Sequence, residues 1–215
     1  MSERARPSHG LLAWLYQGAR PIPTTHNGTM WLTRRLGTWR LFGLDGSDQA
    51  TPYMDALWRL TLRRVAEGGL VVRRALVLGV ALGATPALVR ARWPEVDVVA
   101  VDWEPTLFEL GRSLGIHRDH ARTRFVAGDA AEVTAGLEGT FDLVLVDLFR
   151  GRRVAEATRS AALIDHVAAR LAPGGVVAVN AFSEPGVLEP WRARFERTTV
   201  TRCAVNLVAH LSGPR

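Results

Sequence analysis

From Arg74 onward, short runs of consecutive apolar residues alternate with segments whose apolar residues recur every three or four positions. The runs are typical of strands buried on both faces, and the periodic segments are typical of helices that pack one side against a sheet. The pattern predicts strands near 75–79, 97–102, 123–127, 141–147, 175–181 and 198–210, and helices near 85–93, 105–114, 130–137, 158–171 and 187–195. Such alternation predicts an α/β fold with a doubly wound, mostly parallel, Rossmann-like sheet.

The beginning of the chain follows a different pattern. Residues 1–28 contain Pro, Gly and Arg with little periodicity, so we expect an irregular arm there, with a short helix or docking segment at 11–16. Residues 29–46 alternate between apolar and polar, which predicts a small β-hairpin that turns near Gly37.

A helix is predicted after this hairpin. Apolar side chains recur at helical spacing from Met54 to Val65, and the pair Gly68 and Gly69 ends the pattern. We therefore expect an N-terminal part at 1–70, made of arm, hairpin and helix, that packs on a core domain at 71–215.

Composition and charge exclude several classes of function. The chain has 215 residues with 47% hydrophobic and 22% charged, which suits an ordinary globular protein with one full core. Its net charge is +6 and its pI about 11, but it contains no lysine, and arginine alone raises the calculated pI. The arginines are scattered over predicted helices and loops, which argues against a dedicated nucleic-acid module.

The single cysteine, Cys203, permits no internal disulfide, and we expect it to be a buried small hydrophobic residue. This fits a reducing compartment, so a cytoplasmic location is expected. The first residues lack a signal-peptide pattern, and the apolar segment at 11–16 is too short to cross a bilayer. No membrane partner is therefore expected, and a homodimer is left open.

Candidate chemistry begins at residues 74–93, "RALVLGVALGATPALVRARW". The apolar run breaks at Gly79 and Gly83, and a helix follows with Thr85 as the expected cap and Pro86 at its first position. A strand, a small-residue turn and a helix form a nucleotide cradle, because glycine lets the backbone approach a ligand and the helix start offers free N–H groups.

Acidic residues close the next three predicted strands. Asp102 and Glu104 end the second strand, where a carboxylate about 20 residues downstream of the glycine turn accepts hydrogen bonds from a ribose. Asp129 ends the third, before a helix that starts at Ala130, and Asp147 ends the fourth. Each carboxylate has an alternative role as a helix cap or a loop acceptor. Because strand ends meet at one edge of the sheet, together they predict a bound nucleoside.

Five segments in this order resemble the class I S-adenosylmethionine-dependent methyltransferase fold, and more narrowly its spermidine-synthase-like branch. They are "LVLGVALGATP", "VVAVDWEP", "FVAGDAAEV", "FDLVLVDLFRG" and "LAPGGVVAVNAF". Upstream, "LFGLDGSDQATPYMDAL" resembles the junction between hairpin and core in polyamine synthases. The resemblance extends from Trp39 to Phe182.

The resemblance implies a cofactor site for S-adenosylmethionine or its decarboxylated form. Asp102 would hold the ribose diol, since a carboxylate accepts two charge-assisted hydrogen bonds, and Asp129 with Ala130 would hold the adenine, with Trp103 beside it. The residues implied at the amino-acid end, or closing the site, are Gly79, Ala81, Gly83, Gln49 and Tyr53. Asp147 would face the sulfonium and the acceptor, and Asp147 and Tyr53 are the catalytic candidates.

The chain also departs from polyamine synthases. Leu82 stands where those enzymes carry an Asp for the aminopropyl end of the donor, and Arg150 stands where a second Asp binds the diamine. Their usual His after the Tyr is Met54 here. Arg150, Arg152 and Arg153 would repel a cationic diamine. These differences favour methyl transfer to a small neutral or anionic acceptor.

Three alternatives stay open. The chain could be an aminopropyltransferase that uses decarboxylated S-adenosylmethionine, or a non-catalytic nucleoside-binding or dimerisation module. An NAD-dependent oxidoreductase would also use Asp102, but the turn lacks the G-x-G-x-x-G pattern. No metal is expected, because His117 and His120 are predicted in a solvated loop with only Asp119 beside them.

Overall fold

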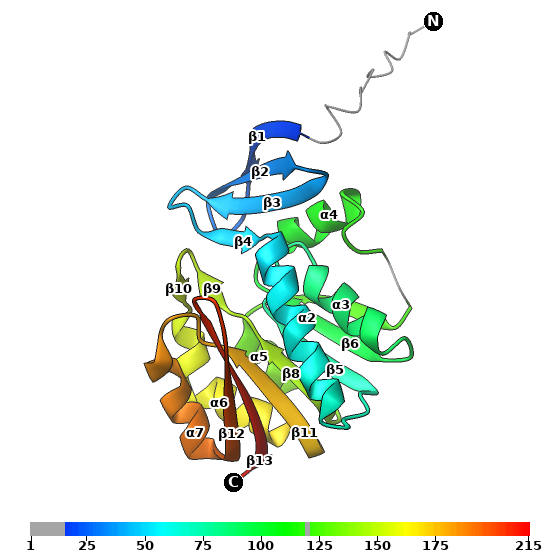
Figure 1. Cartoon of the computed structure of the whole chain (residues 1–215), viewed down its shortest axis with the longest axis vertical. Helices are drawn as coiled ribbons and strands as arrows, with labels where there is room; N and C mark the ends of the chain where they lie inside the picture. The colour runs from blue at the N-terminus through cyan, green and yellow to red at the C-terminus, as the bar shows by residue number, and fades with distance from the viewer. Residues whose placement is uncertain (1–15, 119–120) are drawn as a thin grey trace, which may run out of the picture.

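The structure is a computed structural model that describes residues 16–118 and 121–215. A seven-stranded sheet with helices on both faces forms the larger part of the molecule, and a four-stranded antiparallel sheet lies above it (Figure 1). The predicted docking segment at 11–16 lies outside the described residues except for its last position.

The central sheet has the strand order β12-β13-β11-β8-β5-β6-β7. Its parallel strands are β5 (Arg74–Leu78), β6 (Asp97–Asp102), β7 (Thr123–Ala127), β8 (Phe141–Val146) and β11 (Leu171–Asn180). The antiparallel strands β13 (Asn206–Pro214) and β12 (Phe195–Cys203) extend it beyond β11. The mostly parallel Rossmann-like sheet predicted from the sequence is confirmed.

The prediction of one strand at 198–210 is wrong, because this segment is the hairpin of β12 and β13. The chain turns at Ala204, whose φ of 49° lies in the left-handed region. Glycine or asparagine usually marks such a conformation, and an alanine there gave no turn signal in the sequence.

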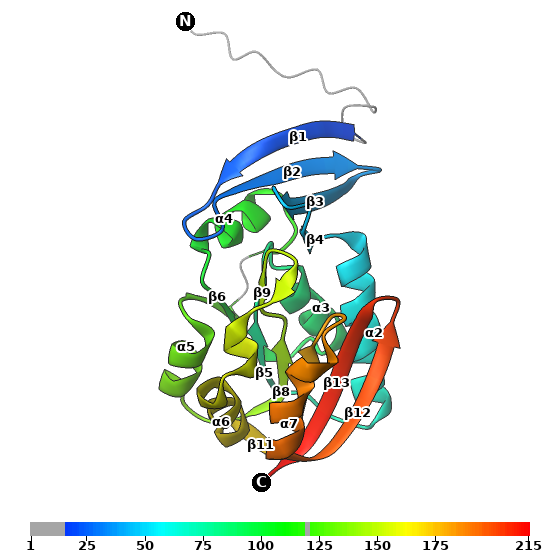
Figure 2. The same ribbon diagram turned by 90° about the vertical axis from the view of Figure 1, so that its left-hand side faces the viewer.

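Helices cover the sheet on both faces. They are α2 (Pro52–Glu67), α3 (Ala84–Arg92), α4 (Pro105–Ser113), α5 (Ala130–Gly136), α6 (Ala161–Ala169) and α7 (Glu189–Arg194), with 3-10 turns at Glu156–Arg159 and Pro185–Leu188. Along β5, Ala75 and Val77 point into the core shared with α2 and α3, while Leu76 and Leu78 point into the core beneath α5 and α6. Figure 2 shows these two helix pairs on opposite sides of the sheet.

The start of α3 differs from the prediction. The helix begins at Ala84 with Gly83 as its N-cap residue, so Thr85 and Pro86 lie inside the first turn and are buried. Gly83 has a φ of 80°, and a Cβ atom there would overlap the ring of His117. Glycine is therefore required at this cap for conformation and for space.

The N-terminal sheet consists of β1 (Tyr16–Pro23), β2 (Thr29–Arg35), β3 (Thr38–Gly43) and β4 (Asp48–Ala50). The hairpin of β2 and β3 around Gly37 is confirmed. The prediction of an irregular arm through residue 28 is wrong for β1, which pairs with β2. Pro21 and Pro23 argued against a strand in the sequence, because proline is tolerated in a sheet mainly at an edge. The structure places β1 at such an edge.

A hydrophobic cluster joins this sheet to the core. The buried side chains of Ile22, Met30, Leu32 and Leu41 pack with Leu82 of the glycine turn and Leu107 of α4. The upper sheet is thereby fixed over the carboxyl ends of the parallel strands. The division of the chain at residue 70 stays a prediction.

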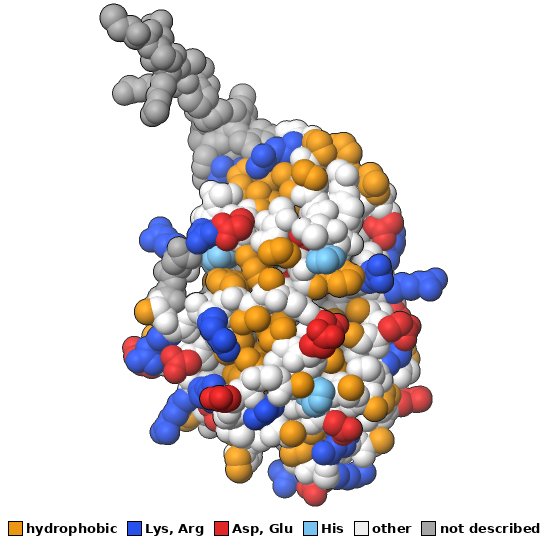
Figure 3. Space-filling model, turned by 180° about the vertical axis from the view of Figure 1, so that it is seen from behind, with side chains coloured by type: hydrophobic (Ala, Val, Ile, Leu, Met, Phe, Trp, Pro, Cys, Tyr) orange, Lys and Arg blue, Asp and Glu red, His pale blue; other side chains and the backbone are white. Residues whose placement is uncertain are grey.

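Charged side chains of both signs are mixed on the surface. On the face in Figure 3, arginine and acidic side chains are interspersed rather than gathered into one stripe. Among the described residues, none of the helices combines the length and the apolar character needed to cross a membrane.

Candidate functional site

A cavity of about 510 Å³ lies where β5, β6, β7 and β8 end, between the central sheet and the upper sheet. Nine of the ten residues predicted for the site line it, namely Gln49, Tyr53, Gly79, Ala81, Asp102, Trp103, Asp129, Ala130 and Asp147. The tenth, Gly83, lies between lining residues but does not itself reach the cavity. The strand ends therefore converge as the sequence predicted.

The glycine turn passes close beneath this cavity. Gly79 has a φ of 84°, and a Cβ atom there would overlap the carbonyl oxygen of Asp147 at the end of β8. Its N–H group donates to Val101 of β6 at 2.8 Å. Ala81 also has a positive φ, 43°, which is uncommon outside glycine. These contacts therefore hold the turn between the ends of β6 and β8.

Asp102 holds this turn through its carboxylate. One oxygen, Oδ2, accepts hydrogen bonds from the N–H groups of Val80 at 2.9 Å and Ala81 at 3.0 Å. The other, Oδ1, accepts from the N–H of Glu104 at 3.0 Å. Burial raises the pKa of Asp102, although these three donors act against the shift. Asp102 thus combines a structural role with a place in the cavity wall.

Glu104, the second acid at the end of β6, does not line the cavity. It is fully buried and serves as the N-cap of α4, where Oε1 accepts from Thr106 N at 3.3 Å. Its Oε2 accepts from His26 N, in the β1–β2 turn, at 2.7 Å. Burial opposes ionisation, but the backbone donors together outweigh it and lower the pKa of Glu104. Of the two acids, only Asp102 is available to a ligand.

Asp129 caps α5 and also lies at the cavity edge. Its Oδ1 accepts hydrogen bonds from Ala131 N at 2.8 Å and Glu132 N at 3.1 Å, and the residue is exposed. The cap was the alternative interpretation of this acid, and it coexists with a lining position. Ala130, the first residue of the helix, is buried beside it.

Asp147 follows the last residue of β8, and each of its oxygens accepts a hydrogen bond from the protein. Oδ2 accepts from the indole Nε1 of Trp58 at 2.8 Å, and Oδ1 accepts from Nδ2 of Asn180 at 2.8 Å. Burial raises the pKa of Asp147 to about 6, while the two donors act against this. A carboxyl with such a pKa can accept and release a proton near neutral pH.

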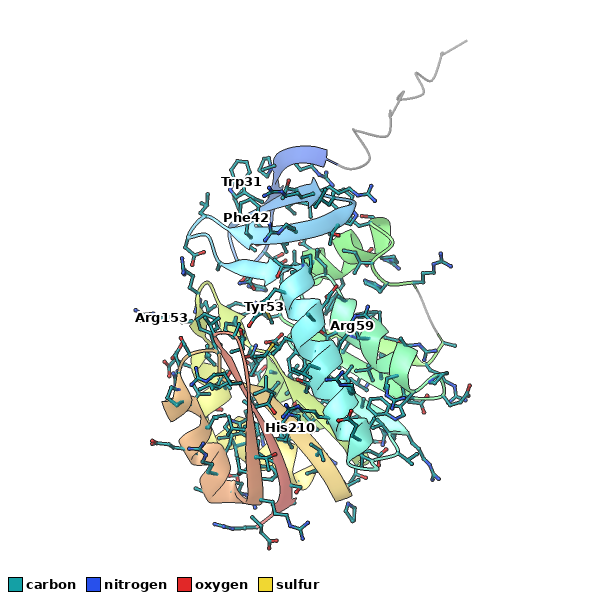
Figure 4. The ribbon with its side chains drawn as sticks, in the orientation of Figure 1. Trp31, Phe42, Tyr53, Arg59, Arg153 and His210 are labelled. Atoms are coloured by element: carbon teal, nitrogen blue, oxygen red, sulfur yellow. The ribbon has the colours of Figure 1, made fainter. Side chains whose placement is uncertain are left out.

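Tyr53 lies at the start of α2, on the side that faces the turn between β12 and β13 (Figure 4). Its hydroxyl lies 2.7 Å from Oδ1 of Asn206 and 2.6 Å from the carbonyl oxygen of Cys203. Burial is the main cause that raises the pKa of Tyr53, so its phenol stays protonated at neutral pH.

Sequence reasoning missed three members of this arrangement, namely Trp58, Asn180 and Asn206. Trp58 lies within the periodic apolar segment that predicts a helix, and its ring does pack in the core, but its N–H points to Asp147. Asn180 directly ends the apolar run of β11, and an amide at a strand end was a signal for it. Asn206 follows the turn that the sequence did not reveal.

Trp103 is in contact with two side chains of the protein. The His26 ring stacks on it with centroids 5.4 Å apart, and the guanidinium carbon of Arg150 lies 5.3 Å from its ring centroid. Arg150 belongs to β9 (Phe149–Arg150), which pairs with β10 (Arg153–Val154) in a small hairpin. Gln49 holds this hairpin by donating Nε2 to the Gly151 carbonyl at 3.2 Å. The hairpin and β4 thus cover the cavity together.

His117 does not lie in a solvated loop as predicted. It is buried, with Nε2 3.0 Å from the Phe108 carbonyl oxygen and its ring 4.6 Å from the ring of Phe125. His120 and Asp119 lie outside the described residues. Within the described ranges, no three histidine, cysteine or acidic side chains gather as a metal site would require. Cys203 is a free, partly buried thiol packed against the core.

Comparison with known proteins gives distant relatives. No family model matches the chain. A polyamine aminopropyltransferase from Vibrio vulnificus is 26% identical over 113 residues, which cover 51% of this chain and 38% of that protein. The match therefore spans about two fifths of the relative's length.

Solved structures resemble this one over most of its length. The spermidine synthase from Thermotoga maritima superposes with a TM-score of 0.69 at 14% identity, covering 99% of this chain and 82% of the other. Human methyltransferase-like protein 13, solved in complex with SAH, gives a TM-score of 0.62 at 20% identity, covering 75% and 81%. Identities this low establish a shared fold and leave the activity to be argued from the site itself.

Proposed function

We propose that the cavity binds S-adenosylmethionine and serves methyl transfer to a small acceptor. The chain has the class I S-adenosylmethionine-dependent methyltransferase fold, which spermidine synthases share. One observation carries the proposal. The glycine turn, Asp102, Asp129 and Asp147 come from four neighbouring strand ends and line a single cavity.

The residues fit the proposed cofactor. Backbone N–H groups occupy both acceptor positions of Oδ2 and one of the two on Oδ1 of Asp102, so Oδ1 keeps one position for a ribose O–H. Gly79 lines the cavity, and its missing Cβ atom lets the turn lie against the Asp147 carbonyl oxygen at the end of β8. The exposed Asp129 adds an acceptor at the adenine end.

The chemistry supplied by S-adenosylmethionine is an activated carbon on a positively charged sulfur. The protein's own task is to orient the acceptor, exclude water and hold a proton. Asp147 suits the last task, because a pKa of about 6 leaves it ionised at neutral pH and able to take a proton from an attacking O–H or N–H. Trp58 and Asn180 hold the carboxylate in one orientation.

The choice of methyl transfer rests on the glycine turn and the covering hairpin. Leu82 is buried in the cluster beneath the upper sheet, so no acid stands there to pair with a lone aminopropyl ammonium. Arg150 and Arg152 line the cavity and offer cations to a carboxylate, which S-adenosylmethionine carries and its decarboxylated form lacks. Aminopropyl transfer is the second candidate, favoured by the Vibrio vulnificus relative.

Isothermal titration calorimetry with S-adenosylmethionine, its decarboxylated form and NAD tests the proposal. We expect S-adenosylmethionine to bind most tightly. Tighter binding of the decarboxylated form would transfer the proposal to aminopropyl transfer, and binding of NAD alone would refute both.

Two variants test the role of Asp102. Asp102→Asn should weaken binding tenfold to a hundredfold, about 1.5–3 kcal/mol, because a charged hydrogen bond to the ribose is lost. Asp142→Asn is the matched control, since Asp142 also accepts two N–H groups, those of Arg73 and Arg74, but at the opposite end of β5. Equal affinities in both variants would remove the ribose assignment.

A further inference from the structure

A line of hydrogen bonds runs through the protein from Tyr53 to Asp147. The Tyr53 hydroxyl reaches Oδ1 of Asn206 at 2.7 Å, and Nδ2 of Asn206 donates to Oδ1 of Asn180 at 2.8 Å. Nδ2 of Asn180 then donates to Oδ1 of Asp147 at 2.8 Å. Both asparagines are almost fully buried, and Asn206 lines the cavity together with Tyr53 and Asp147 at the two ends.

The direction of this line is fixed at one backbone group. The N–H of Phe182 donates to Oδ1 of Asn180 at 3.0 Å, so the amide of Asn180 cannot be reversed without opposing two donors. Nδ2 of Asn180 must therefore point to Asp147. Its Oδ1 must accept from Asn206, which turns the Oδ1 of Asn206 toward Tyr53.

The backbone that supplies this N–H is itself unusual. Phe182 has a φ of 50°, a left-handed conformation that strains a non-glycine residue. Such a conformation persists only where its surroundings favour it. Here it brings the N–H of Phe182 back to the side chain of Asn180.

Tyr53 consequently has no hydrogen to offer to a ligand. A phenol carries one hydrogen. Two acceptors, Oδ1 of Asn206 and the Cys203 carbonyl oxygen, lie within 2.7 Å of the phenol oxygen of Tyr53 and compete for that hydrogen. At the other end, Asp147 receives donors on both oxygens, from Asn180 and Trp58. Toward the cavity, both ends of the line therefore present lone pairs.

We propose that Asn180 and Asn206 are positioning residues that hold Asp147 as a proton acceptor and direct the hydroxyl hydrogen of Tyr53 away from the bound acceptor. The consequence of this positioning role for catalysis rests on the proposed function. The methyl-accepting atom must then bring its own hydrogen, as an O–H or N–H group does, because neither Tyr53 nor Asp147 supplies one. A single role for both amides explains why two polar side chains are buried side by side between Tyr53 and Asp147.

The test follows the ionisation of Asp147 in the protein without ligand. The indole N–H of Trp58 donates to Asp147, so its NMR signal in 15N-labelled protein reports the charge of the carboxyl. Trp58→Phe identifies the signal. We expect an inflection near pH 6 that is absent in Asp147→Asn.

The variants should act in the order of the line. Asn180→Ala should raise the inflection by about one pH unit, a tenfold change in acidity, because a donor to the carboxylate is lost. Asn206→Ala should raise it less and Tyr53→Phe least, since each acts through the next residue. Asn27→Ala is the matched control, an asparagine that lines the cavity away from the line, and should leave the inflection in place.

An unchanged inflection in folded Asn180→Ala would overturn the proposal, and so would an Asn206→Ala shift larger than that of Asn180→Ala. If Asn180→Ala does not fold, the wild-type protein still decides. The side-chain NH₂ signals of Asn180 must then inflect at the same pH as the indole of Trp58, and their failure to do so refutes the line. Because the titration uses the protein without cofactor, a failure of S-adenosylmethionine to bind would leave its result unaffected.

Discussion

The buried carboxyl of Asp147 should make the stability of the folded chain depend on pH in a measurable way. Its pKa is about 6 in the folded protein against an ordinary value of 3.8, so the folded state holds this proton more tightly than the unfolded state does. The contribution of Asp147 to the free energy of unfolding is therefore fully present below pH 3.8 and is lost as the pH rises through 6. The loss amounts to about 3 kcal/mol above pH 6.

Asp147→Asn isolates this term, because the variant keeps every other titrating group. Urea unfolding of both proteins at several pH values gives the free energy of unfolding of each. The wild type should lose about 2.5 kcal/mol relative to the variant between about pH 4 and about pH 8. An amide at position 147 meets the donors of Trp58 and Asn180 poorly, but this offset is the same at every pH.

Parallel stability curves for the two proteins would refute the reasoning, since they would mean that Asp147 ionises as easily in the folded as in the unfolded chain. A wild type that gains stability relative to Asp147→Asn as the pH rises would show that folding lowers the pKa of Asp147 instead. Either result would also remove Asp147 as a base poised near neutral pH.

Three further substitutions test the frame of the site by thermal unfolding. Gly79→Ala should cost about 3 kcal/mol or more of folding free energy, because residue 79 has a left-handed conformation and its Cβ atom would overlap the carbonyl oxygen at the end of β8. Gly136→Ala should cost nothing, because no atom lies within 4 Å of its Cβ position. Leu82→Asp should destabilise the protein by about 3 kcal/mol or more, because the charge is buried. Leu36→Asp, at a residue that is 67% exposed, should not. Glu104→Ala should cost about 2 kcal/mol or more, since two backbone N–H groups lose their acceptor. Wild-type melting temperatures in Gly79→Ala, Leu82→Asp or Glu104→Ala would contradict the packing described at that position.

Several elements could be predicted from the sequence because their signals are local. The limits of β6 and β7 were predicted to the residue, since each is a short segment of strand-forming residues bounded by turn residues. The convergence of Asp102, Asp129 and Asp147 was also predictable, because parallel strands bring their carboxyl ends to one edge whatever their neighbours are. The edge strand β1 and the turn at Ala204 were not, because proline and alanine gave the wrong local signal.

The sequence by itself determined the alternation of strands and helices, the glycine turn and the strand ends that carry acids, because each depends on residues adjacent in the chain. Only the tertiary structure decided which acid faces the cavity, since Glu104 turns to cap a helix and bind the upper sheet while Asp102 stays at the cavity. It also decided the partners of Asp147, because Trp58 and Asn180 lie 89 and 33 residues away in sequence. Hydrogen bonds between such distant residues depend on how the helices and strands pack, and no local pattern encodes that.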